Sequence, residues 1–166
     1  NALINSGGNV MALGTKNGSP WRIGIQHPRQ PGPLAVLSLK DGEAIGTSGD
    51  YQRYFELDGK RYCHLLDPSS GLPVTHTQSL SVLITPQAGA GTLSDAASKP
   101  LFIAGKNWPE LAPALGVSHV LRVDADGHLE ASAAFMQRIE SGSLTASDVS
   151  IRPMEHVAPA ANRGIP

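Results

Sequence analysis

The segment LAVLSLKDGEAIGTSGDYQRYFELDGKRYCHLL, residues 34–66, decides the fold class because it holds two Asp-Gly pairs between apolar, alternating runs. Asp-Gly is typical of two-residue hairpin turns, in which both central residues adopt positive φ. Residues 40–43 therefore predict a hairpin between strands 34–39 and 44–47. Residues 57–60 predict a second hairpin between strands 51–56 and 61–66. Two hairpins in succession indicate an antiparallel meander.

The rest of the chain adds short strands and then a late pair of helices. A glycine link, residues 89–91, precedes a helical pattern that starts near residues 92–95 and ends at Gly105. Pro100 predicts a kink in that helix or a later start, and residues 108–115 predict a second short helix. Because no helix is expected before this region, the fold class is α+β with a largely antiparallel sheet. Further strands are predicted at residues 2–5, 21–25, 80–85, 119–123 and 129–131.

Length and patterning indicate one domain. A chain of 166 residues with 40% apolar and 16% charged residues can bury a core of its own. Periodicity disappears after Glu140, so we expect a domain over residues 1–140 and an irregular tail over residues 141–166. The chain opens directly on a strand-like run at Asn1, so we expect an upstream part to precede it.

Composition excludes several classes of function. The formal net charge of −1, from 13 basic and 14 acidic residues, provides no electrostatic surface for nucleic acid. The apolar runs are far shorter than the ~20 residues that a membrane-spanning helix needs. A single cysteine, Cys63, allows no internal disulfide, and its apolar surroundings predict a buried strand thiol.

Two neighbouring segments concentrate the residue types of a polar ligand site. Residues 47–51 offer hydroxyl groups and a flexible glycine, and residues 64–71 offer a histidine, an acid and a tight turn. Each also has a purely structural interpretation. The first segment suits an ordinary turn, His64 suits a sheet position, and Asp67 suits a cap of turn amides. Asp95 suits a helix start, where the dipole favours a carboxylate.

Five segments, however, occur together in an order and spacing typical of one family. They are NALINSGGNV (residues 1–10), Trp21 with Gly24-Ile25, TSGDY (residues 47–51), YCHLLDP (residues 62–68) with Gly71 and Pro73, and SDAAS (residues 94–98). Together they resemble the C-terminal half of the ApbE family, the FAD:protein FMN transferases formerly called thiamine biosynthesis lipoproteins. The resemblance covers roughly residues 1–140 and implies a fold of the tunnelling-fold kind.

The resemblance implies a phosphoryl-type transfer. In such a reaction a divalent metal, usually Mg²⁺, neutralises the pyrophosphate of FAD while a Ser or Thr hydroxyl of a target protein attacks it. FMN then becomes attached to the target protein and AMP is released. Splitting a pyrophosphate requires charge neutralisation more than covalent help from the enzyme, and Mg²⁺ prefers oxygen ligands.

The same resemblance implies roles for individual residues. Asp95 matches the metal-binding aspartate at the head of the late helix. His64 matches the histidine of a His-x-x-Asp-Pro motif, where it accepts a proton from the attacking hydroxyl. Asp67 then orients that histidine or a water molecule. The segment that lines the flavin site is matched by Ser48, Gly49, Asp50 and Tyr51, and Lys99 of the late helix is also expected to bind the cofactor.

One position departs from the pattern of the family. Its helix usually offers a threonine as a second metal ligand four residues after the aspartate, where this chain has Lys99. A protonated lysine does not bind Mg²⁺, but its ammonium group can reach Asp95 from one turn away and occupy the place of the cation. The alternative function is therefore a degenerate homologue that binds a flavin, a nucleotide or a partner protein without catalysis.

The resemblance also carries expectations about the rest of the protein. The first half of the family's sequence, which supplies another metal ligand and much of the FAD pocket, is expected upstream of Asn1. Family members often lie on the periplasmic side of bacterial membranes, tethered through an upstream lipidated cysteine. We therefore expect a periplasmic or membrane-tethered protein whose partners are FAD and a flavin-acceptor protein.

Overall fold

A seven-stranded sheet forms the centre of the computed structural model, which describes residues 1–145 and 147–154. Its strand order is β1-β2-β5-β8-β9-β10-β11. All neighbouring strands are antiparallel except β10 and β11, which are parallel. The strands are β1 Ala2–Ser6, β2 Asn9–Leu13, β5 Ala44–Gly49, β8 Thr77–Ile84, β9 His119–Asp124, β10 Leu129–Ala131 and β11 Val149–Ile151.

Two small antiparallel sheets accompany the main one. In the first, β3 (Trp21–Gln26) pairs with β4 (Pro33–Leu39), and in the second, β6 (Tyr54–Leu57) pairs with β7 (Lys60–Cys63). The helical elements are α1 Ala90–Ala104, η1 Gly105–Asn107, α2 Trp108–Leu111, η2 Pro113–Leu115 and α3 Ala133–Met136. The prediction of an α+β fold with a largely antiparallel sheet is thus confirmed.

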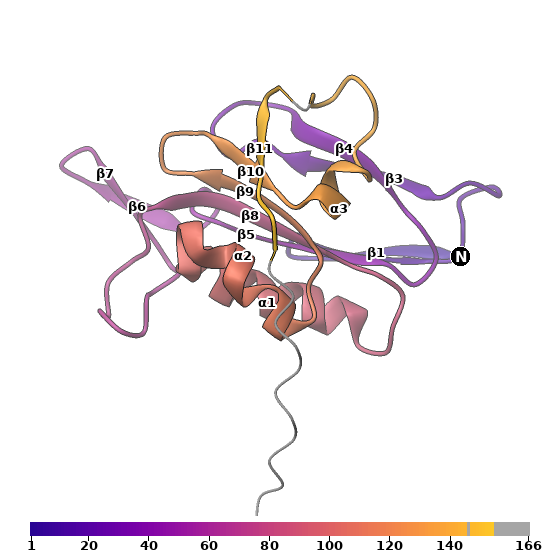
Figure 1. The fold of residues 1–166 in the computed structure, drawn as a ribbon, viewed down its shortest axis with the longest axis horizontal. Coiled ribbons are helices and arrows are strands. Elements are labelled where there is room, and N and C mark those ends of the chain that lie inside the picture. The colour runs from indigo at the N-terminus through magenta and orange to yellow at the C-terminus, as the bar shows by residue number, and fades with distance from the viewer. Residues whose placement is uncertain (146, 155–166) are drawn as a thin grey trace, which may run out of the picture.

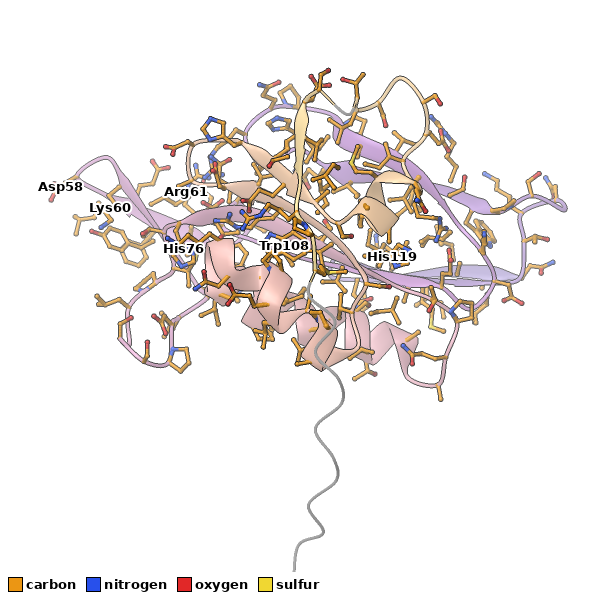
Figure 2. The ribbon with its side chains drawn as sticks, in the orientation of Figure 1. Asp58, Lys60, Arg61, His76, Trp108 and His119 are labelled. Carbon is orange, nitrogen blue, oxygen red and sulfur yellow. The ribbon has the colours of Figure 1, made fainter. Side chains whose placement is uncertain are left out.

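The elements are arranged in three layers. The helices α1 and α2 cover one face of the main sheet, and the β3–β4 pair with α3 covers the other (Figure 1). Strand β8 is buried along its whole length because both of its faces are covered. Leu80 and Val82 join the core beneath α1, whereas Leu83 joins the core beneath β4. Trp108, fully buried, lies in the helical layer (Figure 2).

A glycine sets how closely α1 approaches the main sheet. A Cβ atom added at Gly46 of β5 would lie 2.5 Å from the carbonyl oxygen of Ser94 and 2.9 Å from the amide nitrogen of Asp95. Only glycine therefore lets the helix backbone rest directly on the strand. One turn further along α1, the hydroxyl oxygens of Ser48 and Ser98 lie 2.8 Å apart and form a buried hydrogen bond.

The second Asp-Gly hairpin is confirmed and the first is corrected. Strands β6 and β7 join through Asp58 and Gly59, both at positive φ, and their hairpin extends away from the three layers (Figure 2). Residues 40–43 also turn, but they connect β4 to β5, which belong to different sheets. The predicted pairing of these two strands, and hence the meander, is wrong, because β5 is inserted between β2 and β8.

Two boundaries also differ from the prediction. Helix α1 begins at Ala90, immediately after its left-handed N-cap Gly89, so residues 90–91 are helical and not a link. The helix continues through Pro100 to Ala104. Beyond Glu140 the chain adds β11 to the main sheet, so the expectation of an irregular tail is wrong for residues 149–151. Residues 155–166 of that tail lie outside the described part.

Cys63 is buried, as predicted, with 4% of its surface exposed. In the described part of the chain, no helix is both long and apolar enough to cross a membrane.

Candidate functional site

A cavity of about 770 Å³ opens where the β1–β2 hairpin ends beside β5. Five parts of the chain line it: the β1–β2 hairpin, strand β3, strand β5 with the loop that follows it, the segment after β7, and helix α1. Its polar and charged lining residues are Asn5, Gln26, Thr47, Ser48, Tyr51, Gln52, Arg53, His64, Asp95 and Lys99.

The cavity exists because β2 pairs with only the first part of β5. Strand β5 pairs with β8 from Ala44 to Gly49, but it pairs with β2 only at Ala44 and Ile45. Residues 46–49 therefore present a strand edge toward the cavity, which we call the β5 edge. Unpaired strand edges offer backbone donors and acceptors to a ligand.

A two-glycine turn at the end of the β1–β2 hairpin also lines the cavity. Gly7 and Gly8 both have positive φ and connect β1 to β2, and the Gly8 amide donates to the Asn5 side chain over 3.0 Å. The end of the hairpin is fastened to α1 by Asn9, whose amide group donates to the Gly91 carbonyl oxygen over 2.8 Å. Asn9 also accepts a hydrogen bond from Ser94 over 3.2 Å.

Three of the four predicted flavin-lining residues lie together at the cavity. Ser48 lines it at the level of α1, and Gly49 and Tyr51 line it at the end of β5. A Cβ atom at Gly49 would lie 2.3 Å from Cε1 of Tyr51, so glycine allows the phenol ring to fold back over the strand. Burial raises the pKa of Tyr51 above its ordinary value, which keeps the phenol protonated.

His64 also lines the cavity, and its environment fixes its tautomer. Its Nδ1 lies 3.2 Å from the carbonyl oxygen of Arg53. Because a carbonyl oxygen only accepts hydrogen bonds, Nδ1 carries the proton and donates it. The neutral ring then keeps a free lone pair on Nε2, which suits a proton acceptor. The backbone amide of His64 donates to the same carbonyl oxygen over 3.2 Å. Two hydrogen bonds to Arg53 therefore hold His64 in place.

Asp95 and Lys99 reach the cavity together from α1. The Lys99 Nζ atom lies 2.8 Å from Oδ2 of Asp95 and donates to the backbone carbonyl oxygen of Asp95 over 3.1 Å. The predicted contact between these two side chains is therefore present. They are 57% and 44% exposed, respectively, so the ion pair lies at the mouth of the cavity and not in the core.

Two predicted site residues lie elsewhere. Asp50 turns away from the cavity and accepts two hydrogen bonds from Arg29, over 2.7 and 2.6 Å. Asp67 accepts hydrogen bonds from the amide and hydroxyl groups of Ser69, over 2.9 and 2.7 Å. These bonds lower the pKa of Asp67. Asp67 therefore caps the turn after β7, and His64 is oriented by the Arg53 carbonyl group in place of Asp67.

The cavity offers few ligands for a divalent metal. Asp95 is the one carboxylate among its described lining residues, and Lys99 already pairs with it. One group of three acidic or histidine side chains in the described residues is spaced closely enough for a metal, namely Asp124, Asp126 and His128. It belongs to the turn between β9 and β10 and does not line the cavity.

Sequence reasoning missed some of the lining residues. Arg53 adds a positive charge and orients His64, and Ile23 and Gln26 of β3 form one wall. The position of Arg53, two residues after the segment 47–51, was the available signal for its role. Nothing local in β3 indicates that it faces β5 across a cavity, because that arrangement depends on the packing of two separate sheets.

Comparison with known proteins identifies the family. The family model described as the ApbE family matches residues 1–121. The FAD:protein FMN transferase of Rhodobacter capsulatus is 40% identical over 141 residues, which cover 84% of this chain and 26% of that protein. The FAD:protein FMN transferase of Treponema pallidum is 37% identical over 151 residues, which cover 83% of this chain and 40% of that protein.

Solved structures agree with this assignment. The crystal structure of the ApbE protein of Thermotoga maritima superimposes with a TM-score of 0.73 at 38% identity, covering 84% of this chain and 45% of that one. The apo form of the flavinyl transferase ApbE of Pseudomonas stutzeri superimposes with a TM-score of 0.65 at 34% identity, covering 84% and 44%. The chain thus spans less than half the length of each of these relatives.

Proposed function

Because the chain belongs to the ApbE family, we propose that it forms part of an FAD:protein FMN transferase. Its substrates are FAD and an acceptor protein that presents a Ser or Thr hydroxyl. The observation that carries the proposal is the composition of the cavity. All five segments that resemble the family contribute residues to its lining, although they come from residues as far apart as Asn5 and Asp95.

The cavity suits a long, polar ligand with a flat ring. Its volume of about 770 Å³ is within the range of small-molecule sites. The apolar wall from Ile23 and Ile25 and the Tyr51 ring suit an isoalloxazine, and Arg53 and Lys99 suit the phosphate groups. The β5 edge provides backbone groups for the remaining polar atoms of the ligand.

The reaction requires one proton transfer at His64. The acceptor hydroxyl oxygen forms a bond to the phosphorus of the FMN moiety, the phosphoanhydride bond breaks, and AMP leaves with the bridging oxygen. The hydroxyl proton passes to Nε2 of His64, whose Nδ1 is held by the Arg53 carbonyl oxygen. The developing imidazolium is stabilised by that same hydrogen bond.

The residues of this chain do not fit a resident Mg²⁺ in the cavity. In phosphate sites Mg²⁺ is bound through one or two carboxylates together with substrate phosphates and water, whereas the one carboxylate of the described lining is already bound to an ammonium group. Our proposal therefore includes no metal-dependent step. For localisation we propose the periplasmic side of a bacterial membrane, on the resemblance alone.

A second candidate function is supported by the same ion pair. A cavity whose cation is a lysine can hold FAD or another nucleotide without transferring any part of it. Incubation of the protein with FAD and a set of Ser- and Thr-containing peptides separates the two functions. Transfer yields peptides that carry FMN, detected by mass spectrometry, and an equal amount of AMP, whereas a holding protein leaves FAD intact.

Two variants make this assay specific to the proposed mechanism. His64→Gln keeps a polar side chain but removes the proton acceptor, and we expect transfer to fall by ~10²–10⁴-fold while FAD binding persists. Asp67→Ala is the matched control, because Asp67 caps a turn outside the cavity. Equal losses for both variants would contradict the assignment of the proton acceptor to His64.

A further inference from the structure

We propose that Lys99 is the built-in cation of the cavity, so that the protein binds the diphosphate group of an ester such as FAD or ADP without a divalent metal. Asp95 holds the Lys99 ammonium group when the cavity is empty and releases it to the diphosphate. The identity of the ester as FAD rests on the proposed function, whereas the preference for a diphosphate follows from the charges of the cavity.

The ammonium group of Lys99 is held by two oxygen atoms of Asp95. Lys99 Nζ lies 2.8 Å from Oδ2 of Asp95 and 3.1 Å from the backbone carbonyl oxygen of the same residue. A cation bound by the Asp95 carboxylate would compete with this ammonium group for Oδ2. Lysine is a compact point charge with three donors on a flexible stem, so it can follow a phosphate oxygen that enters the cavity.

The residues that line the cavity carry a net positive charge. The described ionic residues among them are Asp95, Lys99 and Arg53. Once the ion pair cancels, a positive charge remains at Arg53. Such a lining attracts an anion and repels Mg²⁺. The neighbouring Ser48 hydroxyl group carries no charge and is hydrogen-bonded to Ser98 over 2.8 Å.

Lys99 can exchange Asp95 for another anion at little cost in stability. Its side chain is 44% exposed and that of Asp95 is 57% exposed. Ion pairs at such exposure contribute little to stability because water and salt screen them. A diphosphate, with more than one negative charge and several acceptor oxygens, therefore competes successfully with a single carboxylate for the ammonium group.

The proposal gives Asp95 the opposite role from the one it has as a metal ligand. If Asp95 bound Mg²⁺, its replacement would abolish metal-dependent binding of FAD. If it only holds Lys99, its replacement frees the ammonium group and removes a negative charge from the cavity. The sign of the effect of Asp95→Asn thus separates the two roles.

The test is calorimetric titration of the protein with ADP and with FAD, once in EDTA and once in Mg²⁺. For the unmodified protein we expect equal affinity in both conditions. Lys99→Thr should weaken binding in EDTA by about tenfold to a hundredfold, the loss of one charge-assisted hydrogen bond. Lys99→Arg should retain binding, since it keeps the charge, and Asp95→Asn should tighten it about two- to fivefold. Both side chains are roughly half exposed, so the three variants should melt close to the unmodified protein.

Several results would overturn the proposal: binding that requires Mg²⁺, loss of binding in Asp95→Asn, unaltered binding of Lys99→Thr in EDTA, or no binding of either ligand. The peptide assay keeps this proposal distinct from the proposed function. Metal-independent binding without FMN transfer would refute the transferase and leave the role of Lys99 intact. FMN transfer that stops in EDTA would support the transferase and refute the role of Lys99.

Discussion

Replacement of Gly46 by alanine tests how the cavity is built. The added Cβ would lie 2.5 Å from the carbonyl oxygen and 2.6 Å from the carbonyl carbon of Ser94, and 2.9 Å from the amide nitrogen of Asp95. These are backbone atoms of α1, so no side-chain rotation relieves the clash. Ser94 itself is fully buried, which prevents a local bend toward solvent. Helix α1 as a whole must therefore move away from β5.

The size of the effect follows from the distances. Ordinary contacts between such atoms are about 3.5 Å, so the helix must retreat by roughly 1 Å. Overpacking of this kind costs about 1–3 kcal/mol in the free energy of unfolding. For a chain of this length, each kcal/mol lowers Tm by about 2–4 °C, so we expect Gly46→Ala to melt about 2–12 °C lower. The same retreat displaces Asp95 and Lys99, and FAD affinity should fall as well.

Thermal melting followed by circular dichroism measures the first effect and FAD titration the second. Gly91→Ala provides the control, because Gly91 lies on the same helix and its added Cβ would meet only Met11 Sδ, at 3.4 Å. Alanine is favoured over glycine in helices by about 1 kcal/mol, so Tm should stay unchanged or rise. A Gly46→Ala variant that melts and binds FAD like the unmodified protein would refute the close packing of α1 on β5.

Three further predictions concern residues around the cavity and beneath it. Asp50→Asn should lose ~1.5–3 kcal/mol of stability because it removes the charged partner of Arg29. Its affinity for FAD, measured by titration, should stay within about twofold of the unmodified protein. A large loss of affinity would show that Asp50 contacts the ligand after all. Gly49→Ala should push the Tyr51 ring outward. The pKa of Tyr51, which burial raises, should then fall toward the ordinary tyrosine value of 10.0 in a phenolate absorbance titration. For Glu43, burial raises the pKa, but hydrogen bonds from Arg138 and from the backbone outweigh burial and lower the pKa below its ordinary value of 4.5. The resulting stabilisation is complete above pH 4.5 and is lost as the pH falls through the folded-state pKa, so urea melts at decreasing pH should show a steeper loss for the unmodified protein than for Glu43→Gln.

The elements that the sequence predicts well are those fixed by local chemistry. The β6–β7 hairpin depends on Asp58 and Gly59, which take positive φ side by side. The contact of Asp95 with Lys99 is a pair four residues apart on one helix, so its geometry follows from the helix itself. In both cases the interacting residues are close neighbours in the sequence. The local sequence pattern is therefore enough to predict the contact.

The sequence predictions fail at positions whose structure depends on residues far away in the sequence. The turn at residues 40–43 is locally indistinguishable from a hairpin turn, but Leu37 and Leu39 are buried beneath the main sheet and not in it. Strand β11 has three residues, of which only Val149 is buried, too short a pattern to predict a strand. Asp50 stands within the family's flavin-lining segment, but Arg29, 21 residues earlier, determines where its carboxylate lies.

The cavity itself follows from the length of one hairpin. Strands β1 and β2 pair from Ala2 with Leu13 to Ser6 with Asn9, and the turn comes immediately after. Asn9 then fastens the end of the hairpin to Gly91 and Ser94 of α1. Because β2 begins at Asn9, its pairing with β5 stops at Ile45 and leaves the β5 edge without a partner on that side. The backbone N–H and C=O groups of the β5 edge, which a neighbouring strand would otherwise pair, therefore face the cavity. There they can form hydrogen bonds with a ligand.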